Sequence, residues 1–384
     1  MKILLKGYYG FGNLGDDILM LTTHHLMKKK YPEAKFFIFS NFDSDLKGFS
    51  QQPGYNNYII KLLGEQLTII NWTYQGEFDL VIDGGGGVYF GVDKGSRIGV
   101  GVNKALIKIG AKYVYRLDQL LRKLSGRKRH LTYKSRVGFG IGIGPYSSSS
   151  ILFYRHLVEI GSTSVLFVRD KTSLGFLNII KFRGVKELCA DVAFLWANWQ
   201  HQFDQHRKKK TNINKIGIIL LDWQDGDDSR FMEFKKFANK QIENGKSVTF
   251  FSFDENADKR YFETFAKRYD YKVWRPNKME LKEFLEPLSQ QDILFSARAH
   301  GVIIGAIYGV PSICIGVSCK LIEVSKMLPS GTSVVGDYPT ATILEEELGI
   351  ASRTFEARLD GLKQNVLANI NLGLKSWEHF SNEL

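Results

Sequence analysis

Cysteine is scarce in this sequence: three occur among its 384 residues, at Cys189, Cys314 and Cys319. Their number is odd and no CxxC spacing occurs, so we expect neither a disulfide framework nor a zinc site, and the composition favours a reducing compartment. The first residues, MKILLKGYYG, include no apolar stretch long enough for a signal peptide. A cytoplasmic protein is therefore predicted.

Metal-binding patterns are also missing from the neighbourhood of the glycine-rich segments. No HxH or HExxH motif occurs in the sequence. The acidic run of Asp225, Asp227 and Asp228 is interpreted as a solvated loop rather than a cation site. We predict no metal and no bound cofactor.

Charged residues are absent from Ala299 to Cys319, a stretch about as long as a membrane span. Pro311 lies inside it, and glycines occur at positions 301, 305, 309 and 316. This punctuation is typical of a buried helix, a Gly-Val-Pro turn and a buried strand in an α/β fold. We therefore predict that the stretch belongs to the core of a folded domain.

The overall composition is that of a folded protein, with 44% apolar and 24% charged residues. Its length suits two domains of about 150–200 residues each. The formal net charge of +12 predicts attraction to anions. Phosphorylated substrates, an anionic membrane face and nucleic acid all remain open, because charge alone does not choose among them.

Short apolar segments alternate with helical patterns in both halves of the chain, which predicts parallel sheets with helices on both faces. The predicted strands are Lys2–Lys6, Ala34–Ser40, Asp79–Asp83, Val137–Ile143, Val165–Val168, Ile216–Leu221, Ser247–Phe253, Tyr271–Trp274, Ile293–Ser296 and Ser312–Ile315. We expect an α/β protein with two tandem Rossmann-like domains, residues 1–195 and 215–330, and a helical extension at 331–384. Such domains bind ligands in a cleft at the carboxyl ends of their strands.

An insertion at residues 92–130 interrupts the first domain. It includes ALIKIGAKYVYRLDQLLRKL, in which basic and apolar residues alternate as in a basic amphipathic helix, and it is followed by Arg127, Lys128 and Arg129. One interpretation is a solvated helix packed on the sheet by its apolar face. The other is a helix that also contacts an anionic membrane surface. The sequence leaves both open.

The N-terminal GYYGFGNLGDD lies between a predicted strand and a predicted helix. Its glycines formally match GxGxxG, which brings backbone amides close to an anion. Asp16 and Asp17 fall in the first turn of the helix and would repel a pyrophosphate, so a dinucleotide is not expected. A tight turn facing the cleft, with Gly12 and Asn13 available to a ligand, is predicted instead; the alternative is a purely structural turn with Asp16 as helix cap.

Two further segments follow predicted strands of the first domain. Gly84–Gly87 come after Asp83, where Gly85 and Gly86 would allow the backbone to approach a ligand; a hinge is the alternative. Arg169 follows Val165–Val168 and is suited to a carboxylate or phosphate, or to a salt bridge with a neighbouring loop.

The most informative segment is Phe295–Gly301, FSARAHG. Arg298 and His300 lie two residues apart at a strand–helix junction, where both can face one cleft near a helix N-terminus. Only His300 of the pair exchanges a proton near neutral pH. Lys320 follows the next strand, so Arg298, His300 and Lys320 are expected to converge on one anion.

Taken together, GYYGFGNLGDD, DGGGG, VRDKTS and SARAHGVIIGAIYGVPSICI resemble the polysaccharide pyruvyltransferase family over residues 1 to about 325. The resemblance implies two Rossmann-like domains in an arrangement like that of GT-B glycosyltransferases. It implies phosphoenolpyruvate as donor and a sugar as acceptor, often linked to lipid or nucleotide, in the synthesis of exopolysaccharide, capsule or cell-wall polymer. The first domain would then serve the acceptor and the second the donor.

On this resemblance we expect Arg298 and His300 to be catalytic, with His300 protonating the donor or its phosphate. The expected substrate-binding residues are Arg169, Lys320, Gly12, Asn13, Asp16, Gly85 and Gly86. The base for the sugar hydroxyl is open among Asp16, Asp17 and Asp83. Two other functions stay open: a GT-B glycosyltransferase using a nucleotide sugar, and a non-catalytic, membrane-associated scaffold of polysaccharide assembly. Nucleic acid is not an expected partner. Peripheral contact with the inner face of an anionic membrane is left open.

Overall fold

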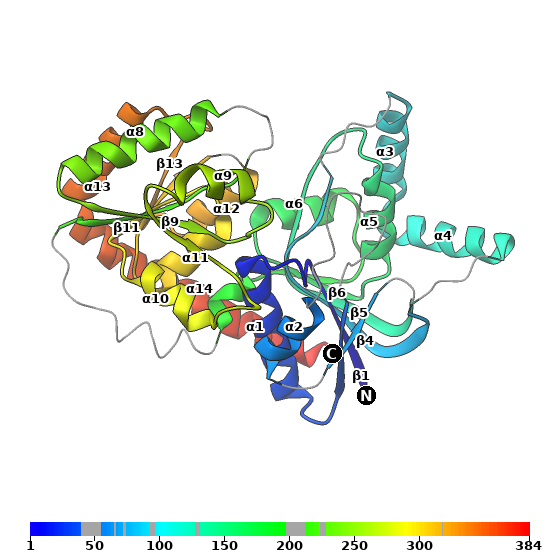
Figure 1. Ribbon diagram of the computed structural model, residues 1–384. Coiled ribbons are helices and arrows are strands. Elements are labelled where there is room, and N and C mark those ends of the chain that lie inside the picture. The colour runs from blue at the N-terminus through cyan, green and yellow to red at the C-terminus, as the bar shows by residue number, and fades with distance from the viewer. Residues whose placement is uncertain are drawn as a thin grey trace. The chain divides into compact units, whose positions relative to one another are not determined.

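The computed structural model describes residues 1–39, 55–64, 67–71, 74–91, 97–126, 131–196, 212–222, 228–316 and 318–384 (Figure 1). The chain forms two compact units. The first comprises Met1–Gly10, Leu19–Val192 and Leu372–Leu384, and the second comprises Phe11–Ile18 and Ala193–Asn371. Sequence reasoning placed the segment around Gly12 in the first domain, whereas the structure groups it with the second. Residues 197–211, most of the segment between the two predicted domains, lie outside the described residues.

The first unit is built on a parallel sheet with the strand order β3-β2-β1-β4-β5-β6-β7. The strands are β1 (Lys2–Lys6), β2 (Lys35–Phe39), β3 (Thr68–Ile70), β4 (Gly76–Gly91), β5 (Leu131–Tyr146), β6 (Val165–Val168) and β7 (Val185–Leu188). The order reverses between β1 and β4, which is the point where open α/β sheets bind ligands.

Helices pack on both faces of this sheet. They are α1 (Leu14–Lys30), α2 (Tyr55–Leu63), α3 (Arg97–Ile109), α4 (Ala111–Ser125), α5 (Leu152–Gly161) and α6 (Lys171–Ile179). On one face, α4, α5 and α6 contribute Val114, Leu157 and Leu177 to a fully buried cluster with β5 and β6. On the other face, Phe139 and Phe167 contact rings from the C-terminal end of the chain.

The second unit repeats the same sheet plan with the order β10-β9-β8-β11-β12-β13, again parallel throughout. Its strands are β8 (Lys215–Ile219), β9 (Ser247–Ser252), β10 (Asp270–Val273), β11 (Ile293–Ser296), β12 (Ser312–Ile315) and β13 (Thr332–Val335). Here the order reverses between β8 and β11. The predicted fold class, with a Rossmann-type parallel sheet in each half, is therefore confirmed.

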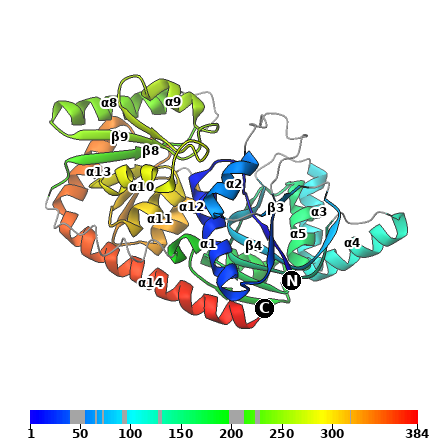
Figure 2. The same cartoon turned by 60° about the horizontal axis from the view of Figure 1, so that its bottom comes forward.

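The helices of the second unit are α8 (Ser229–Glu243), α9 (Lys259–Phe265), α10 (Leu281–Ser289), α11 (Ala299–Ile307), α12 (Cys319–Met327) and α13 (Ala341–Arg353), and a 3-10 turn, η1 (Val192–Leu195), precedes them. The last helix, α14 (Phe355–Asn382), belongs to the second unit as far as Asn371 and to the first unit from Leu372. Phenylalanines of α8 and α9 pack with β8, β9 and β11 in one large core. The predicted helical extension 331–384 in fact begins with the edge strand β13 and continues as α13 and the long helix α14, which Figure 2 shows along its length.

The uncharged stretch from Ala299 folds as predicted. It forms α11, a turn with Gly309 at φ 73°, and the buried strand β12. Every residue from Gly301 to Ile307 is buried within the unit. Among the helices that the structure describes, none is long and apolar enough to cross a membrane.

Candidate functional site

Arg298 stands at the start of α11, directly after the central strand β11 of the second unit. It is the N-cap residue of the helix, with extended backbone (φ −112°, ψ 126°). The buried hydroxyl of Ser296 fixes this turn: it donates to the Arg298 carbonyl (2.8 Å) and accepts from the Arg298 amide (3.2 Å). The strand order reverses at β11, so this junction is where the fold places ligands.

The Arg298 guanidinium is largely buried, with 13% of its side chain exposed, and forms an ion pair with the fully buried Asp258. Asp258 is itself held by a 3.0 Å hydrogen bond from the Ser252 hydroxyl. Burial by itself would lower the pKa of Arg298, but the carboxylates of Asp258, Asp254 and Asp16 raise it above its usual value. Arg298 Nε is buried with no hydrogen-bond partner among the described residues.

Asp254 is a second carboxylate near Arg298. Its Oδ1 accepts hydrogen bonds from the amides of Asn256 (3.1 Å) and Ala257 (2.9 Å). Burial raises the pKa of Asp254 in spite of these bonds and of the charge of Arg298. The protonated form of this carboxyl is therefore favoured more than in water.

His300 packs directly against the N-terminal glycine turn. A methyl group built on Gly15 would lie 2.1 Å from His300 Nδ1 and 2.6 Å from its Cγ. No side chain other than hydrogen fits between the two segments at these distances. The GxGxxG-like turn and the Arg-x-His pair, which are far apart in sequence, thus meet in the same unit.

The first turn of α1 is anchored to the second unit by two hydrogen bonds. The Leu14 amide donates to the Phe253 carbonyl at 2.9 Å, and Trp274 Nε1 donates to Asp17 Oδ2 at 2.8 Å. Asn13 caps the helix, since its Oδ1 accepts from the amides of Gly15 (3.0 Å) and Asp16 (3.4 Å). The sequence alone offered Asp16 as the helix cap in the structural alternative, and the structure shows that the cap is Asn13 instead.

Lys320 lies half-buried in the first turn of α12, which Ser318 caps through the Leu321 amide. Because β11 and β12 pair in parallel, α11 and α12 begin at the same edge of the sheet. Lys320 therefore starts its helix on the same side as Arg298, although its role as an anion ligand stays a prediction.

Arg169 occupies a buried ion pair in the first unit. Its Nη1 lies 2.6 Å from Asp191 Oδ2, and both side chains are almost fully buried. Asp170, next to it, caps α6 by accepting from the Ser173 amide at 2.6 Å. The ion pair agrees with the salt-bridge alternative for Arg169, and substrate binding by Arg169 stays a prediction.

The sequence predicted that Gly84–Gly87 form a loop after a strand. They lie instead inside β4, which pairs with β5 as far as Gly91. A methyl group on Gly84 would lie 2.3 Å from the Tyr9 hydroxyl, which donates to the Gly84 carbonyl. Gly85 has φ 77° and packs against Val192. Packing at position 84 and the left-handed backbone at position 85 thus favour glycine without any ligand, and a contact of Gly85 or Gly86 with substrate stays a prediction.

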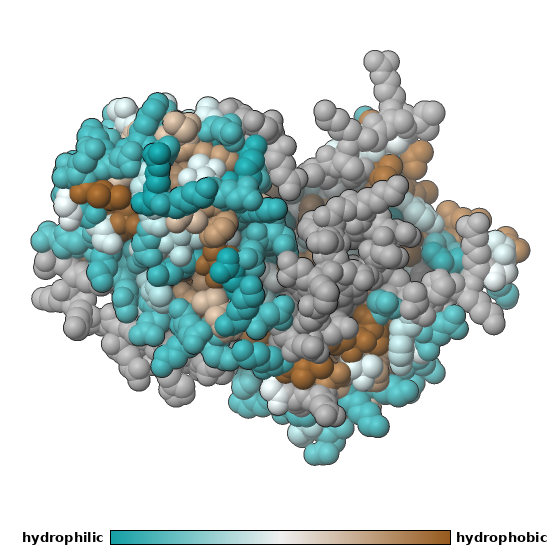
Figure 3. All heavy atoms as spheres, in the orientation of Figure 1, coloured by the Kyte–Doolittle hydropathy of each residue, from teal (hydrophilic) through white to brown (hydrophobic). Residues whose placement is uncertain are grey.

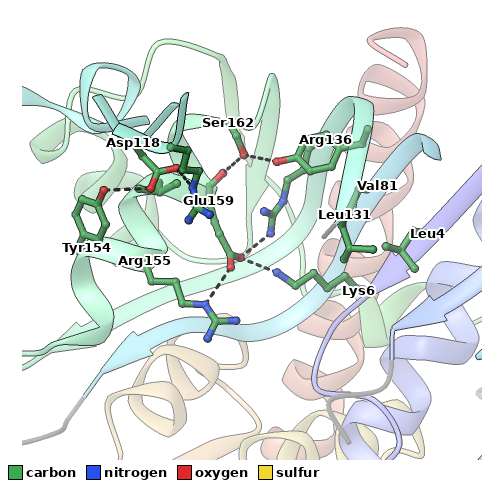
Figure 4. A pocket seen from close by; sticks show the side chains of 13 residues that line it. Leu4, Lys6, Val81, Asp118, Leu131, Arg136, Tyr154, Arg155, Glu159 and Ser162 are labelled. Carbon is green, nitrogen blue, oxygen red and sulfur yellow. Dashed lines mark hydrogen bonds and ion pairs between the residues drawn. The ribbon is translucent and has the colours of Figure 1, made fainter. Parts of the chain in front are cut away.

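A pocket of about 600 Å³ opens on the first unit, and none of the predicted site residues lines it (Figure 4). At its wall, the Glu159 carboxylate accepts from Lys6 (2.7 Å), Arg136 (2.8 Å) and Arg155 (3.5 Å). Burial would raise the pKa of Glu159, but the charges of Lys6 and Arg136 hold it well below its usual range.

Arg136 continues this network into the core. It binds both oxygens of Asp83 (2.9 and 3.0 Å), and Tyr89 Oη donates to Asp83 at 2.8 Å. Asp83 is fully buried and engaged. Of the three candidate bases, Asp83 and Asp17 are therefore buried in structural contacts, whereas Asp16 is half-buried beside Arg298.

Sequence reasoning missed Asp254, Asp258 and Trp274. A local signal existed for the aspartates, because they follow the predicted strand Ser247–Phe253. In the part of the chain that the structure describes, no group of three His, Cys, Asp or Glu side chains is positioned to hold a metal ion. Asp225 and Asp227, interpreted as a solvated loop, lie outside the described residues.

A sequence model of the family described as polysaccharide pyruvyl transferase matches residues 13–318. The chain belongs to this family. The match includes the α1 turn, Arg298 and His300, and it confirms the resemblance seen in the motifs. No curated protein sequence matches the chain.

Among solved structures, this pyruvyl transferase family member is similar to UDP-GlcNAc 2-epimerase from Neisseria meningitidis (TM-score 0.51, 12% identity, 98% of this chain and 100% of that one). It is also similar to the epimerase from Methanocaldococcus jannaschii (0.53, 13%, 91% and 92%) and to HepE from Anabaena (0.53, 9%, 100% and 100%). At these identities the likeness shows the fold, two Rossmann-like domains, and nothing of the substrate.

Proposed function

We propose that this family member transfers the pyruvyl group of phosphoenolpyruvate to two hydroxyls of a sugar, forming a pyruvate ketal. The observation that carries the proposal is the meeting of Arg298, His300 and the Gly12–Asp16 turn within one unit. Protonation of the donor requires a side chain that can donate a proton, which His300 supplies. Binding of its anionic groups requires an arginine and a helix N-terminus, which Arg298 and the start of α11 supply.

The donor carries close to three negative charges, and Arg298 offers the buried Nε as a donor for one of its oxygens. Lys320 is proposed as the second cation. The carboxylates of Asp16, Asp254 and Asp258 oppose an anion here, but Asp258 is already paired with Arg298 and the raised pKa of Asp254 favours its neutral form. Together these features support an anion site at the start of α11.

In the proposed reaction, His300 delivers a proton to the methylene carbon while a sugar hydroxyl adds to the central carbon. The bond from that carbon to the phosphate oxygen then breaks, and phosphate leaves. A second hydroxyl adds to close the ketal, and its proton goes to the departing phosphate. We propose Asp16 as the base for a hydroxyl, because it is half-buried at the site while Asp17 and Asp83 are held in buried contacts.

The product would enter exopolysaccharide, capsule or cell-wall polymer, with the acceptor sugar carried by lipid or nucleotide. Gly12 and Asn13, predicted to serve the acceptor, lie on the segment that packs beside His300. We therefore propose that the two substrates meet at this turn. Arg169, Gly85 and Gly86 are retained only as candidate acceptor ligands.

The test is a thermal-shift titration with phosphoenolpyruvate and a panel of nucleotide sugars, followed by a phosphate-release assay with candidate acceptors. Arg298→Ala should lose the stabilisation by phosphoenolpyruvate, and Arg298→Lys should keep part of it while still neutralising Asp258. His300→Ala should bind the donor but release no phosphate. Arg268→Ala, an exposed arginine of the same unit, is the matched control.

A response to nucleotide sugars alone would refute pyruvyl transfer and favour a glycosyltransferase. A protein that responds to neither ligand would favour the non-catalytic scaffold. A shift by phosphoenolpyruvate that persists undiminished in Arg298→Ala would move the donor site elsewhere.

A further inference from the structure

Helix α4 exposes an unusual amount of apolar side chain. Five large residues of this helix are 43% to 76% exposed: Tyr113, Leu117, Leu120, Leu121 and Leu124. Their spacing places them on one side of a helix with 3.6 residues per turn. Only Ala111, Val114 and Asp118 of α4 are buried, and they lie on a different side. The leucines are thus not the ones that pack α4 onto its unit.

A row of basic residues borders the apolar side. Lys112, Arg116 and Lys123 fall within about 40° of one another around the helix, next to Tyr113 and Leu120. The single acidic residue from Arg97 to Ser125 is Asp118. Its carboxylate is buried, accepting from Arg122 Nε at 2.7 Å and Tyr154 Oη at 3.2 Å, so it does not offset the exposed cations.

The preceding helix α3 also exposes apolar side chains. Val102 and Ile109 are 49% and 43% exposed, and Lys104 and Lys108 are exposed on another side of this helix. The inner side of α3 is held by Leu106 and by Asn103, which donates to the carbonyls of Ser148 and Ser150. Figures 1 and 2 both show α4 extending outward from its sheet, and Figure 3 shows hydrophobic surface over α3 and α4.

We propose that the exposed side of α3 and α4, defined by Val102, Ile109, Tyr113, Leu117, Leu120, Leu121, Leu124 and the bordering basic residues, is a docking surface for an anionic lipid bilayer. The leucines would enter the boundary between headgroups and acyl chains, and the basic row would contact the lipid phosphates.

Charge decides between a bilayer and a second copy of the chain. A second copy on this side would bring its own basic row against an already cationic surface, with no exposed acid on either helix to neutralise it. Anionic lipid supplies apolar volume and negative charge together. The inference goes beyond the proposed function and does not depend on it, because the surface contains none of the residues assigned to substrate.

The experiment measures co-sedimentation of the full chain with vesicles of phosphatidylcholine alone and with 30% phosphatidylglycerol added, at about 0.05 and 0.5 M salt. Strong binding is expected only to the anionic vesicles and should weaken at high salt. Since each basic residue near such a surface strengthens binding about fivefold, Lys112→Glu with Arg116→Glu and Lys123→Glu should weaken it by about 100-fold or more. Leu120→Ser with Leu124→Ser should weaken it by about tenfold or more.

Matched controls exist in the second unit. Ile242→Ser with Ile350→Ser changes two exposed aliphatic residues, 45% and 40% exposed, and Lys267→Glu with Arg268→Glu and Lys278→Glu changes the net charge equally. Both controls should bind like the unaltered protein, and circular dichroism verifies the fold of every variant. Equal binding by α4 and control variants, equal binding to neutral vesicles, or no binding at all would overturn the proposal. So would a dimer, seen by sedimentation without lipid, that dissociates on Leu120→Ser with Leu124→Ser.

Discussion

Replacing Gly15 by alanine tests the contact on which the candidate site depends. The backbone of Gly15 is not left-handed, so alanine at this position of α1 should by itself stabilise the protein by about 0.4–1 kcal/mol. The new methyl group, however, would fall 2.1 Å from His300 Nδ1 and 2.8 Å from its Cβ. His300 must therefore move, or the turn must.

The expected cost follows from overpacking a well-packed site, which destabilises proteins by about 1–3 kcal/mol. His300→Gly removes all three close contacts, whereas His300→Ala would leave the 2.8 Å approach to Cβ. In the His300→Gly background, Gly15→Ala should thus be neutral or stabilising. The double-mutant cycle should give a coupling of roughly 1.5–4 kcal/mol between the two positions.

The assay is equilibrium urea unfolding of the four proteins, with phosphate release measured in parallel. Gly349→Ala is the control, because its nearest neighbour in this unit is the end of a flexible arginine at 3.6 Å, and it should be stabilising. If Gly15→Ala proves as stable and as active as the unaltered protein, or if the coupling is near zero, then His300 does not pack on the N-terminal turn. The proposed site, which depends on that contact, would then be wrong.

Two further predictions concern stability. Trp274→Phe removes the hydrogen bond to the buried Asp17 carboxylate, which should cost about 1.5–3 kcal/mol by urea unfolding; adding Asp17→Asn should recover part of that loss, and no recovery would contradict the assigned contact. Burial lowers the pKa of His156 to about 4 in the folded protein, whereas the same side chain in the unfolded chain should have a pKa of about 6.5. Protonation of His156 therefore favours unfolding, and the free energy of unfolding should fall as the pH drops from about 6.5 to about 4. His156→Gln should remove that part of the pH dependence, and an unchanged curve between pH 7 and pH 4 would refute the assignment.

The regular elements were largely predictable where local signals agreed. β6, β11 and β12 have the predicted bounds because each is a short apolar run between turn residues. α6 begins where Asp170 caps it. β3, β7 and β13 were missed, since all three are short and partly exposed.

The glycine run shows the limit of such reasoning. Glycine has low strand propensity, so Gly84–Gly87 predicted a loop, yet they extend β4 because Tyr9 and Val192 fill the space that side chains would take. Asn13 was overlooked as a cap because Asp16 and Asp17 gave the stronger first-turn signal.

The sequence by itself determined the fold class, the family motifs and the position of Arg298 and His300 at a strand–helix junction, because periodicity, turn residues and motif spacing are local properties of the chain. Only the tertiary structure decided that Gly15 packs on His300, that Asp258 pairs with Arg298, and that Arg169 is held by Asp191. Those contacts join residues distant in sequence, and side-chain packing and the pairing of buried charges select them only once the sheets are formed.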